Sequence, residues 1–128
     1  MIGEHNIRDK FMTNQIHFIC REKLGIVCID KALNLYISAA WRLSEDEVKA
    51  LSGGMVYFHE KKGQPSYFGG AILKLDETEE LPESAPAPGK KRYILTLEAA
   101  AKAKGIKWDK RGASHGMAWT SGVVVDKE

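Results

Sequence analysis

The sequence predicts an α+β fold, a single domain built on a strongly bent, mostly antiparallel β-sheet or small β-barrel with two or three short helices. Several short runs are rich in β-branched and aromatic residues, and polar or glycine-containing segments separate them. Only a few brief segments have helical character. They are too few and too short to cover both faces of a parallel sheet, so a parallel α/β layout is disfavoured.

Length and composition are those of one ordinary globular domain, residues 1–128. No run approaches the roughly 20 apolar residues of a membrane span, so no membrane partner is expected. The first residues lack a basic segment followed by an apolar core, and a cytoplasmic location is therefore expected. In that compartment Cys20 and Cys28 are predicted to be reduced, buried small hydrophobes, with a disulfide or metal pair as the alternative.

A capping-box pattern just before the centre of the sequence predicts the start of a helix. Ser44 is followed three residues later by Glu47, the pattern that begins a helix, and Gly53 can end that helix in a left-handed conformation. The expected elements are a short N-terminal helix from Ile7, strands at 15–21, 26–29 and 35–43, and a helix at 45–51.

A β-hairpin is predicted between Gly53 and Leu75. Two apolar runs, 55–59 and 67–75, flank a polar segment that contains a glycine and a proline. Since its histidine, tyrosines and glycines lie close to the turn, this hairpin is expected to anchor the sheet and to carry a binding surface.

A flexible loop is expected at about 76–92, where acidic residues give way to a proline-containing stretch and then to three cations. Beyond it we expect a strand at 93–95, a helix at 97–104 closed by Gly105, a short strand at 106–108, and a last strand at 117–125. The alanines and lysines of 97–104 are the basis for that helix.

Positive charge is concentrated between Lys90 and Arg111, where eight Lys and Arg side chains stand against two acids. Such a segment can neutralise phosphates and give salt-sensitive binding of nucleic acid. A lysine-rich solvated face is the alternative. Trp108 lies inside the basic segment, and an aromatic face beside cations is what an unstacked base needs. Each aromatic residue could instead belong to the core.

Histidines and acids permit an enzyme in principle, through His59 and Glu60, Asp76 and Glu77, or His115. Their spacing fits no metal motif, and no nucleophile elbow, phosphate loop or dinucleotide fingerprint is present. No catalytic residue, metal ligand or cofactor is therefore predicted.

The order of strand, capped helix, glycine-led strand, polar tip and second glycine-led strand resembles the PUA-like superfamily, including its EVE and ASCH branches. The matching positions are Gly53, Val56, Phe58, Gly70 and Ile72. The resemblance implies a small barrel that binds DNA or RNA, sometimes through a pocket for a modified or flipped base. The residues implied to face that pocket are Trp41, Tyr67, Trp108 and Trp119, with Ser38 and His115 as hydrogen-bonding groups.

The leading hypothesis is a small non-catalytic nucleic-acid-binding module, with DNA or RNA as partner. Its predicted binding residues are Trp41, Tyr67, Lys90, Lys91, Arg92, Lys107, Trp108, Lys110, Arg111, His115 and Trp119. The alternatives are a protein-interaction, accessory or inhibitor protein that uses an exposed hairpin edge, and a metal-dependent hydrolase acting on nucleic acid through His59 and His115.

Overall fold

A computed structural model describes residues 14–79, 89–109 and 120–124. The strands are β1 (Gln15–Ile19), β2 (Ile26–Asp30), β3 (Leu35–Leu43), β4 (Met55–His59), β5 (Phe68–Thr78), β6 (Lys91–Ala99) and β7 (Thr120–Val124). The helices are the 3₁₀ turn η1 (Arg21–Lys23), the α-helix α2 (Glu45–Leu51) and the 3₁₀ turn η2 (Ala101–Ala103).

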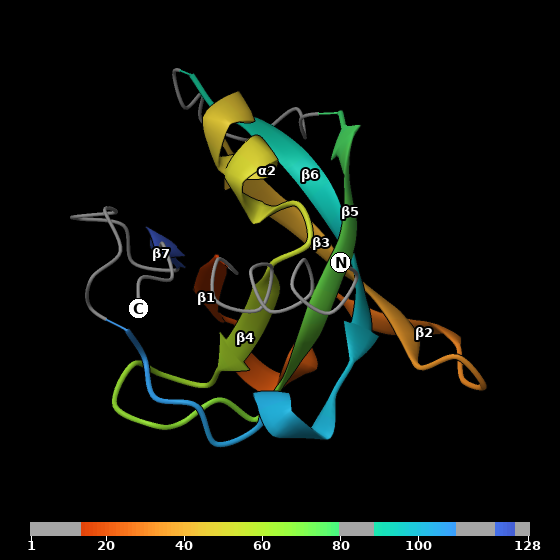
Figure 1. The fold of residues 1–128 in the computed structure, drawn as a ribbon, viewed down its shortest axis with the longest axis vertical. Coiled ribbons are helices and arrows are strands. Elements are labelled where there is room, and N and C mark those ends of the chain that lie inside the picture. The colour runs from red at the N-terminus through yellow and green to blue at the C-terminus, as the bar shows by residue number, and fades with distance from the viewer. Residues whose placement is uncertain (1–13, 80–88, 110–119, 125–128) are drawn as a thin grey trace, which may run out of the picture.

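The strands form one mixed sheet in the order β2-β3-β6-β5-β4-β1-β7 (Figure 1). The predicted hairpin is confirmed, because β4 pairs antiparallel with β5. β1 pairs with β4 in parallel, and the remaining pairs of the described strands are antiparallel. Among the described residues no pairing joins the end strands β2 and β7, so the sheet that they show is open.

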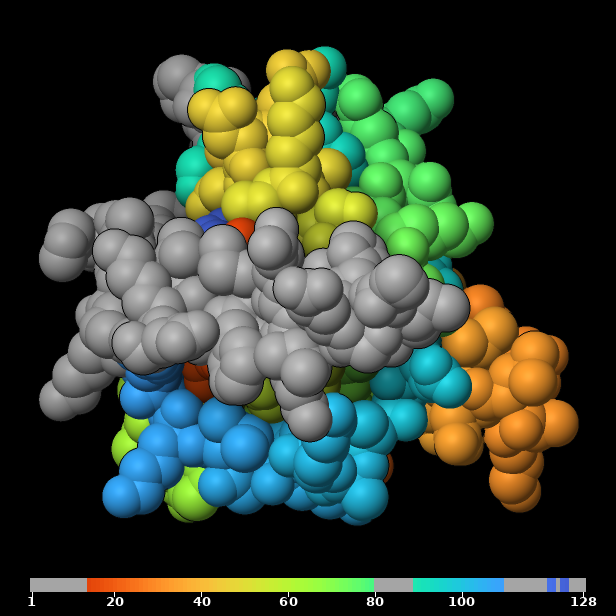
Figure 2. Space-filling view, in the orientation of Figure 1, coloured from red at the N-terminus to blue at the C-terminus, as the bar shows by residue number. Residues whose placement is uncertain are grey.

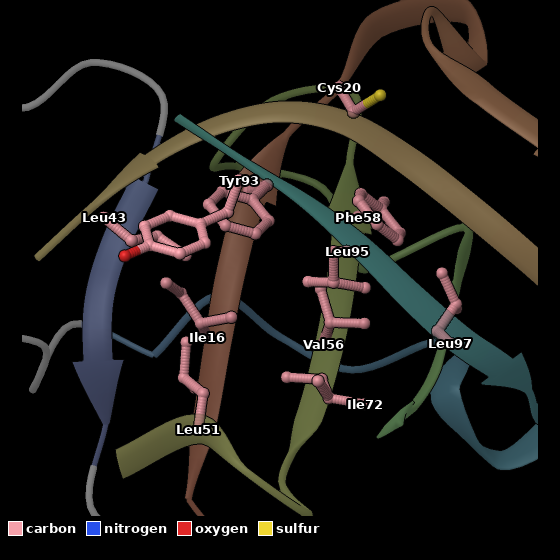
Figure 3. Packing of buried hydrophobic residues seen from close by; sticks show 11 residues of the cluster. Ile16, Cys20, Leu43, Leu51, Val56, Phe58, Ile72, Tyr93, Leu95 and Leu97 are labelled. Atoms are coloured by element: carbon pink, nitrogen blue, oxygen red, sulfur yellow. The ribbon is translucent and has the colours of Figure 1, made fainter. Parts of the chain in front are cut away.

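The core lies against one face of the central strands (Figure 3). Alternate residues of β1 and β4 point into it, so that Phe18 stands opposite Phe58 in the parallel register. Leu95 and Leu97 of β6 are fully buried beside them. Each such side chain stabilises the fold by about 2 kcal/mol through removal of apolar surface from water.

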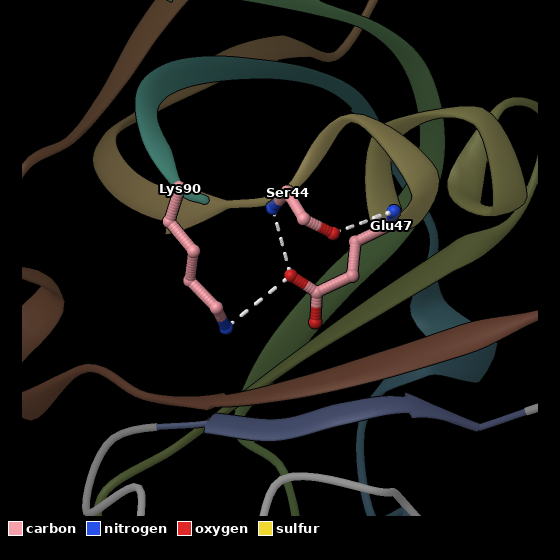
Figure 4. A network of polar contacts seen from close by, with 3 residues as sticks. All are labelled: Ser44, Glu47 and Lys90. Atoms are coloured by element: carbon pink, nitrogen blue, oxygen red, sulfur yellow. Dashed lines mark hydrogen bonds and ion pairs between the residues drawn. The ribbon is translucent and has the colours of Figure 1, made fainter. Parts of the chain in front are cut away.

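Helix α2 begins and ends as the sequence predicts. The Ser44 hydroxyl accepts from the Glu47 amide at 3.1 Å, and the Glu47 carboxylate accepts from the Ser44 amide at 2.9 Å, which completes the capping box (Figure 4). Leu51 packs the helix onto the core, and Gly53 follows with a φ of 76°.

The helix predicted at 97–104 is wrong. Strand β6 continues through Leu97 to Ala99, and only the short η2 turn follows. Helix propensity is overridden here because Leu95 and Leu97 alternate into the core while β3 and β5 pair with the strand on either side. Residues 106–108, predicted as a strand, have no regular structure.

The expected loop at 76–92 is shorter than predicted, since β5 extends to Thr78 and β6 begins at Lys91. Residues 80–88 lie outside the described residues, as do the residues for which an N-terminal helix was predicted and most of the segment before Thr120. No described helix has the length and apolar character needed to cross a membrane.

The β2–β3 hairpin extends away from the rest of the molecule (Figures 1 and 2). Its outer strand exposes about half of Val27 and Ile29, at 53% and 52%. Cys20 is buried as predicted, whereas Cys28 is exposed on this strand because β2 is an edge strand without a covering layer there; both thiols are free.

Candidate nucleic-acid-binding site

A hollow of about 340 Å³ lies where β6 ends. It is bounded by the η1 turn, the start of β3, the start of β5 and the η2 turn. Its lining residues are Lys23, Asn34, Tyr36, Tyr67, Phe68, Ala99, Ala100, Ala101 and Lys104. Its size falls at the small end of the range of ligand pockets.

The three aromatic rings of the hollow come from two distant parts of the chain. Tyr36 meets Phe68 edge to face, with ring centroids 5.0 Å apart and planes at 72°. The Tyr67 hydroxyl donates to the carbonyl oxygen of Cys20. Burial, followed by the nearby Cys20 thiol, raises the pKa of Tyr67, so its hydroxyl remains a protonated donor. The rings are therefore held in place before any ligand arrives.

Two lysines supply positive charge at the same hollow. Lys23 and Lys104 are exposed, and neither makes an ion pair within the part of the chain that the structure describes. Lys23 stands in a turn with a φ of 57°, and the turn is tied by a 2.8 Å hydrogen bond from the Glu22 amide to the Glu60 carboxylate. The exposed ammonium groups can meet an anion without first breaking a salt bridge to any of these described residues.

The cations predicted at the start of the basic segment lie far from this hollow. Lys90 pairs with Glu47 at 3.4 Å and Lys91 with Glu77 at 3.6 Å, while the Arg92 guanidinium donates to the Ala40 carbonyl at 3.3 Å. Strand β6 separates them from Lys104, and nine residues of strand span roughly 26 Å. The structure thus divides the basic segment between two ends of one strand.

Trp41 stacks on Phe18 with ring centroids 3.9 Å apart, and its indole N–H donates to the Ser38 hydroxyl at 2.8 Å. It borders a second hollow of about 370 Å³, which Tyr67 does not line. The residues lining this second hollow are Ile19, Cys20, Arg21, Leu24, Ala39, Ala40 and Trp41. Trp41 and Tyr67 therefore line two different hollows, although both hollows include residues of the η1 turn.

Trp108, which belongs to the basic segment, lies half-buried on a pair of histidines. Its ring centroid is 5.5 Å from that of His17 and 5.1 Å from that of His59. The Lys62 ammonium stands over the indole at 5.4 Å, a cation–π contact. Lys107 is exposed beside it.

The two histidines are fully buried on the face of β1 and β4 that points away from the core. The Nδ1 atom of His17 is 2.8 Å from Nε2 of His59, and Nδ1 of His59 is 2.9 Å from the Gln64 carbonyl oxygen. Burial, with a smaller effect of His59, lowers the pKa of His17 to about 4, and burial also lowers the pKa of His59. Both rings are neutral at pH 7.

Four of the predicted binding residues fall outside the described residues. These are Lys110, Arg111, His115 and Trp119. Of the predicted residues that are described, only Tyr67 lines the aromatic hollow. The sequence signal for Lys104 was present in the charge count, whereas Lys23, Tyr36 and His17 carry no local signal because only the sheet brings them to these places.

No family model, curated protein or solved structure matches the chain. Among the described residues, no group of three or more His, Cys, Asp or Glu side chains is arranged to hold a metal ion. The described residues at the hollow supply aromatic rings and cations that can bind a ligand.

Proposed function

We propose that the chain is a small, non-catalytic nucleic-acid-binding module that holds a single strand of DNA or RNA at the aromatic hollow. One observation carries the proposal: three aromatic rings and two lysines that make no ion pair with a described residue share one concave surface. Unstacked bases gain about 1–3 kcal/mol each by stacking on aromatic side chains, and lysines neutralise the adjoining phosphates. The PUA-like relationship and the cytoplasmic location expected from the sequence belong to the same proposal.

In this proposal a base stacks against the aromatic wall that Tyr36 and Phe68 form together, while the backbone phosphates follow Lys23 and Lys104. The hollow holds about one flat group, so it favours a strand whose bases are already unstacked, or one flipped from a duplex. The lysines and the rings act together because stacking alone would not select an anionic polymer.

The test compares two double variants of equal charge by fluorescence anisotropy with a short labelled single-stranded oligonucleotide. Lys23→Ala/Lys104→Ala should weaken binding roughly 10-fold or more and reduce the slope of log affinity against log salt by about 1.4, the value for two phosphate contacts on a single strand. Lys90→Ala/Lys91→Ala is the matched control, since those lysines are already paired with acids.

Tyr36→Leu should weaken binding by roughly 5-fold or more at every salt concentration while leaving the salt slope unchanged, because a ring carries no charge. Absence of binding at low salt, or equal losses from the two lysine pairs, would contradict the proposal.

A second candidate function is a protein-interaction module. The sheet edge that favours it is strand β2, whereas the sequence predicted the edge of the central hairpin. The central hairpin cannot offer a free edge, since β4 pairs with β1 and β5 pairs with β6. Strand β2 is the sheet edge that exposes apolar side chains, and strand addition could occur there. Affinity capture with Val27→Lys as the control separates this candidate from nucleic-acid binding.

A further inference from the structure

The two buried histidines form a hydrogen-bond chain whose direction is fixed by one carbonyl group. The Gln64 oxygen can only accept, so His59 carries its proton on Nδ1. The Nε2 atom of neutral His59 is then an acceptor, and His17 must donate to it from Nδ1. This leaves Nε2 of His17 as a bare lone pair, buried and without a hydrogen-bond partner among the residues that the structure describes.

The next proton taken up by this pair therefore goes to Nε2 of His17. The groups around the His17 ring in the described structure are the Tyr57 and His59 rings of β4, Trp108 and Asp109 beyond η2, and Lys62 across the indole. Ser121 of β7 accepts from the backbone amide of His17. Asp109 favours the charged form, whereas His59 and above all burial oppose it. The charge is unfavourable chiefly because water does not reach it.

Residues 100–109, here called the strap, cover this pair and also form one wall of the aromatic hollow. Ala100, Ala101 and Lys104 line the hollow at one end of the strap, and Trp108 packs on the histidines at the other. Figures 1 and 2 show this segment in blue along the lower surface, beside the loop that follows β4.

Between those ends the strap is fastened to Ser66. The Ser66 amide donates to the Ile106 carbonyl at 2.8 Å, and the Gly105 amide donates to the Ser66 carbonyl at 2.8 Å. The Ser66 hydroxyl donates to the Ala103 carbonyl at 2.6 Å and accepts from the Ile106 amide at 3.0 Å. Since Ser66 lies two residues after Gln64, the loop that fixes His59 is the loop that fixes the strap.

We propose that protonation of the His17–His59 pair releases Trp108 and the strap, so that the hollow loses the wall carrying Lys104 and its hold on a nucleic acid weakens in acid. This regulation rests on the proposed function. A released strap admits water to the charged ring. The closed form binds the proton about 300-fold more weakly than a hydrated imidazole does, so acid can favour release by up to that factor.

The first experiment needs no nucleic acid. Amide hydrogen exchange of the free protein is followed by NMR at a series of pH values, corrected for intrinsic exchange rates. Between pH 6.5 and pH 4 the Gly105 and Ile106 amides should lose at least 10-fold more of their protection than the amides of Val56 and Leu95 do. Unchanged protection at Gly105 and Ile106, or equal loss throughout the sheet, would overturn the proposal.

The second experiment measures the affinity of the labelled oligonucleotide over the same pH range in the wild type and in His17→Gln. Glutamine can still donate to His59 but takes up no proton, so the variant should lose most of the acid dependence. The same acid dependence in both proteins would overturn the inference. Strap release in acid without oligonucleotide binding at any pH would support it and contradict the proposed function alone. If His17→Gln does not fold, the amide exchange of the wild type still decides.

Discussion

The two ends of strand β6 place cations from one basic segment in opposite electrostatic settings. At its start, Lys90 and Lys91 are paired with carboxylates of α2 and β5. After its end, Lys104 faces a hollow lined by aromatic rings and makes no ion pair with a described residue. A local excess of charge in a sequence therefore does not mark a binding surface, because the fold can neutralise part of it.

The two ends also differ in how they are held. The start of β6 relies on exposed or half-buried charges next to the capping box, whereas the region after its end relies on buried hydrogen bonds at Ser66 and on close backbone packing at Gly70. Buried polar groups cost more to leave unpaired than exposed charges do. Substitutions at the end should therefore cost more stability than those at the start.

The largest effect is expected from Gly70→Ala. A Cβ atom there would lie 2.0 Å from the Glu98 carbonyl oxygen, so β5 and β6 would have to separate where Gly70 pairs with Ala99. We expect a loss of about 3 kcal/mol or more in the free energy of unfolding, measured by urea denaturation. Gly63→Ala, with nothing within 4 Å of its added methyl group, is the control and should change stability little. Equal effects would contradict the close packing.

Acid should destabilise the protein through His17. Its folded pKa is about 4, below the usual 6.5, so the unfolded chain takes up the proton first. The contribution of the neutral His17 ring to the free energy of unfolding is fully present above pH 6.5 and is lost as the pH falls to about 4. The expected loss, measured by urea denaturation, is up to about 3 kcal/mol. If the strap opens before the rest of the protein unfolds, the loss in the free energy of unfolding cannot exceed the free energy needed to open the strap. His17→Gln should remove the acid-dependent part, and an unaltered pH profile in that variant would exclude His17 as its source.

An intermediate effect is expected from Ser66→Ala. This change removes the hydroxyl that bridges the Ala103 carbonyl and the Ile106 amide, so both backbone groups lose their hydrogen bond to it. The expected loss is about 1–3 kcal/mol in thermal or urea denaturation. Ser52→Ala, at an exposed position after α2, should stay within about 0.5 kcal/mol of the wild type. A neutral Ser66 variant would show that the strap is held elsewhere.

The smallest effects belong to the start of β6. Lys90 and Glu47 expose only 24% and 20% of their side chains, whereas Lys91 and Glu77 expose 55% each. Lys90→Ala should cost up to about 1 kcal/mol and Lys91→Ala nearly nothing, because the more exposed pair is better screened. Urea denaturation at low and at high salt checks this, and the Lys90 effect should shrink as salt is added. A larger loss at Lys91 would reverse the order.

Local patterns predicted much of the first half of the fold. Ser44 and Glu47 predict α2, and the two apolar runs around the polar tip predict the β4–β5 hairpin. These predictions are possible because caps and turns depend on residues close in sequence. The same reasoning misplaced Leu97 and the residues after it. Leu97 is in a strand because two neighbouring strands and the core require it there, and the alanines that follow carry no information about those neighbours.

The sequence predicted the chemical character of the candidate site, but it identified only some of the residues that line it. Tyr67 and the basic segment were evident, but Tyr36 and Lys23 reach the hollow only through the pairing of β3 with β6 and the turn before β2. His17 and His59 meet because β1 and β4 are parallel neighbours although they lie 42 residues apart.

The sequence by itself determined the β-rich class, the capped helix, the hairpin and the supply of rings and cations. Only the tertiary structure decided which cations are neutralised, which rings share a hollow, and that two histidines share one buried hydrogen-bond chain. The physical reason is that helix caps and turns are satisfied within a few residues, whereas strand pairing, burial and charge pairing depend on groups that the chain brings together only when it folds.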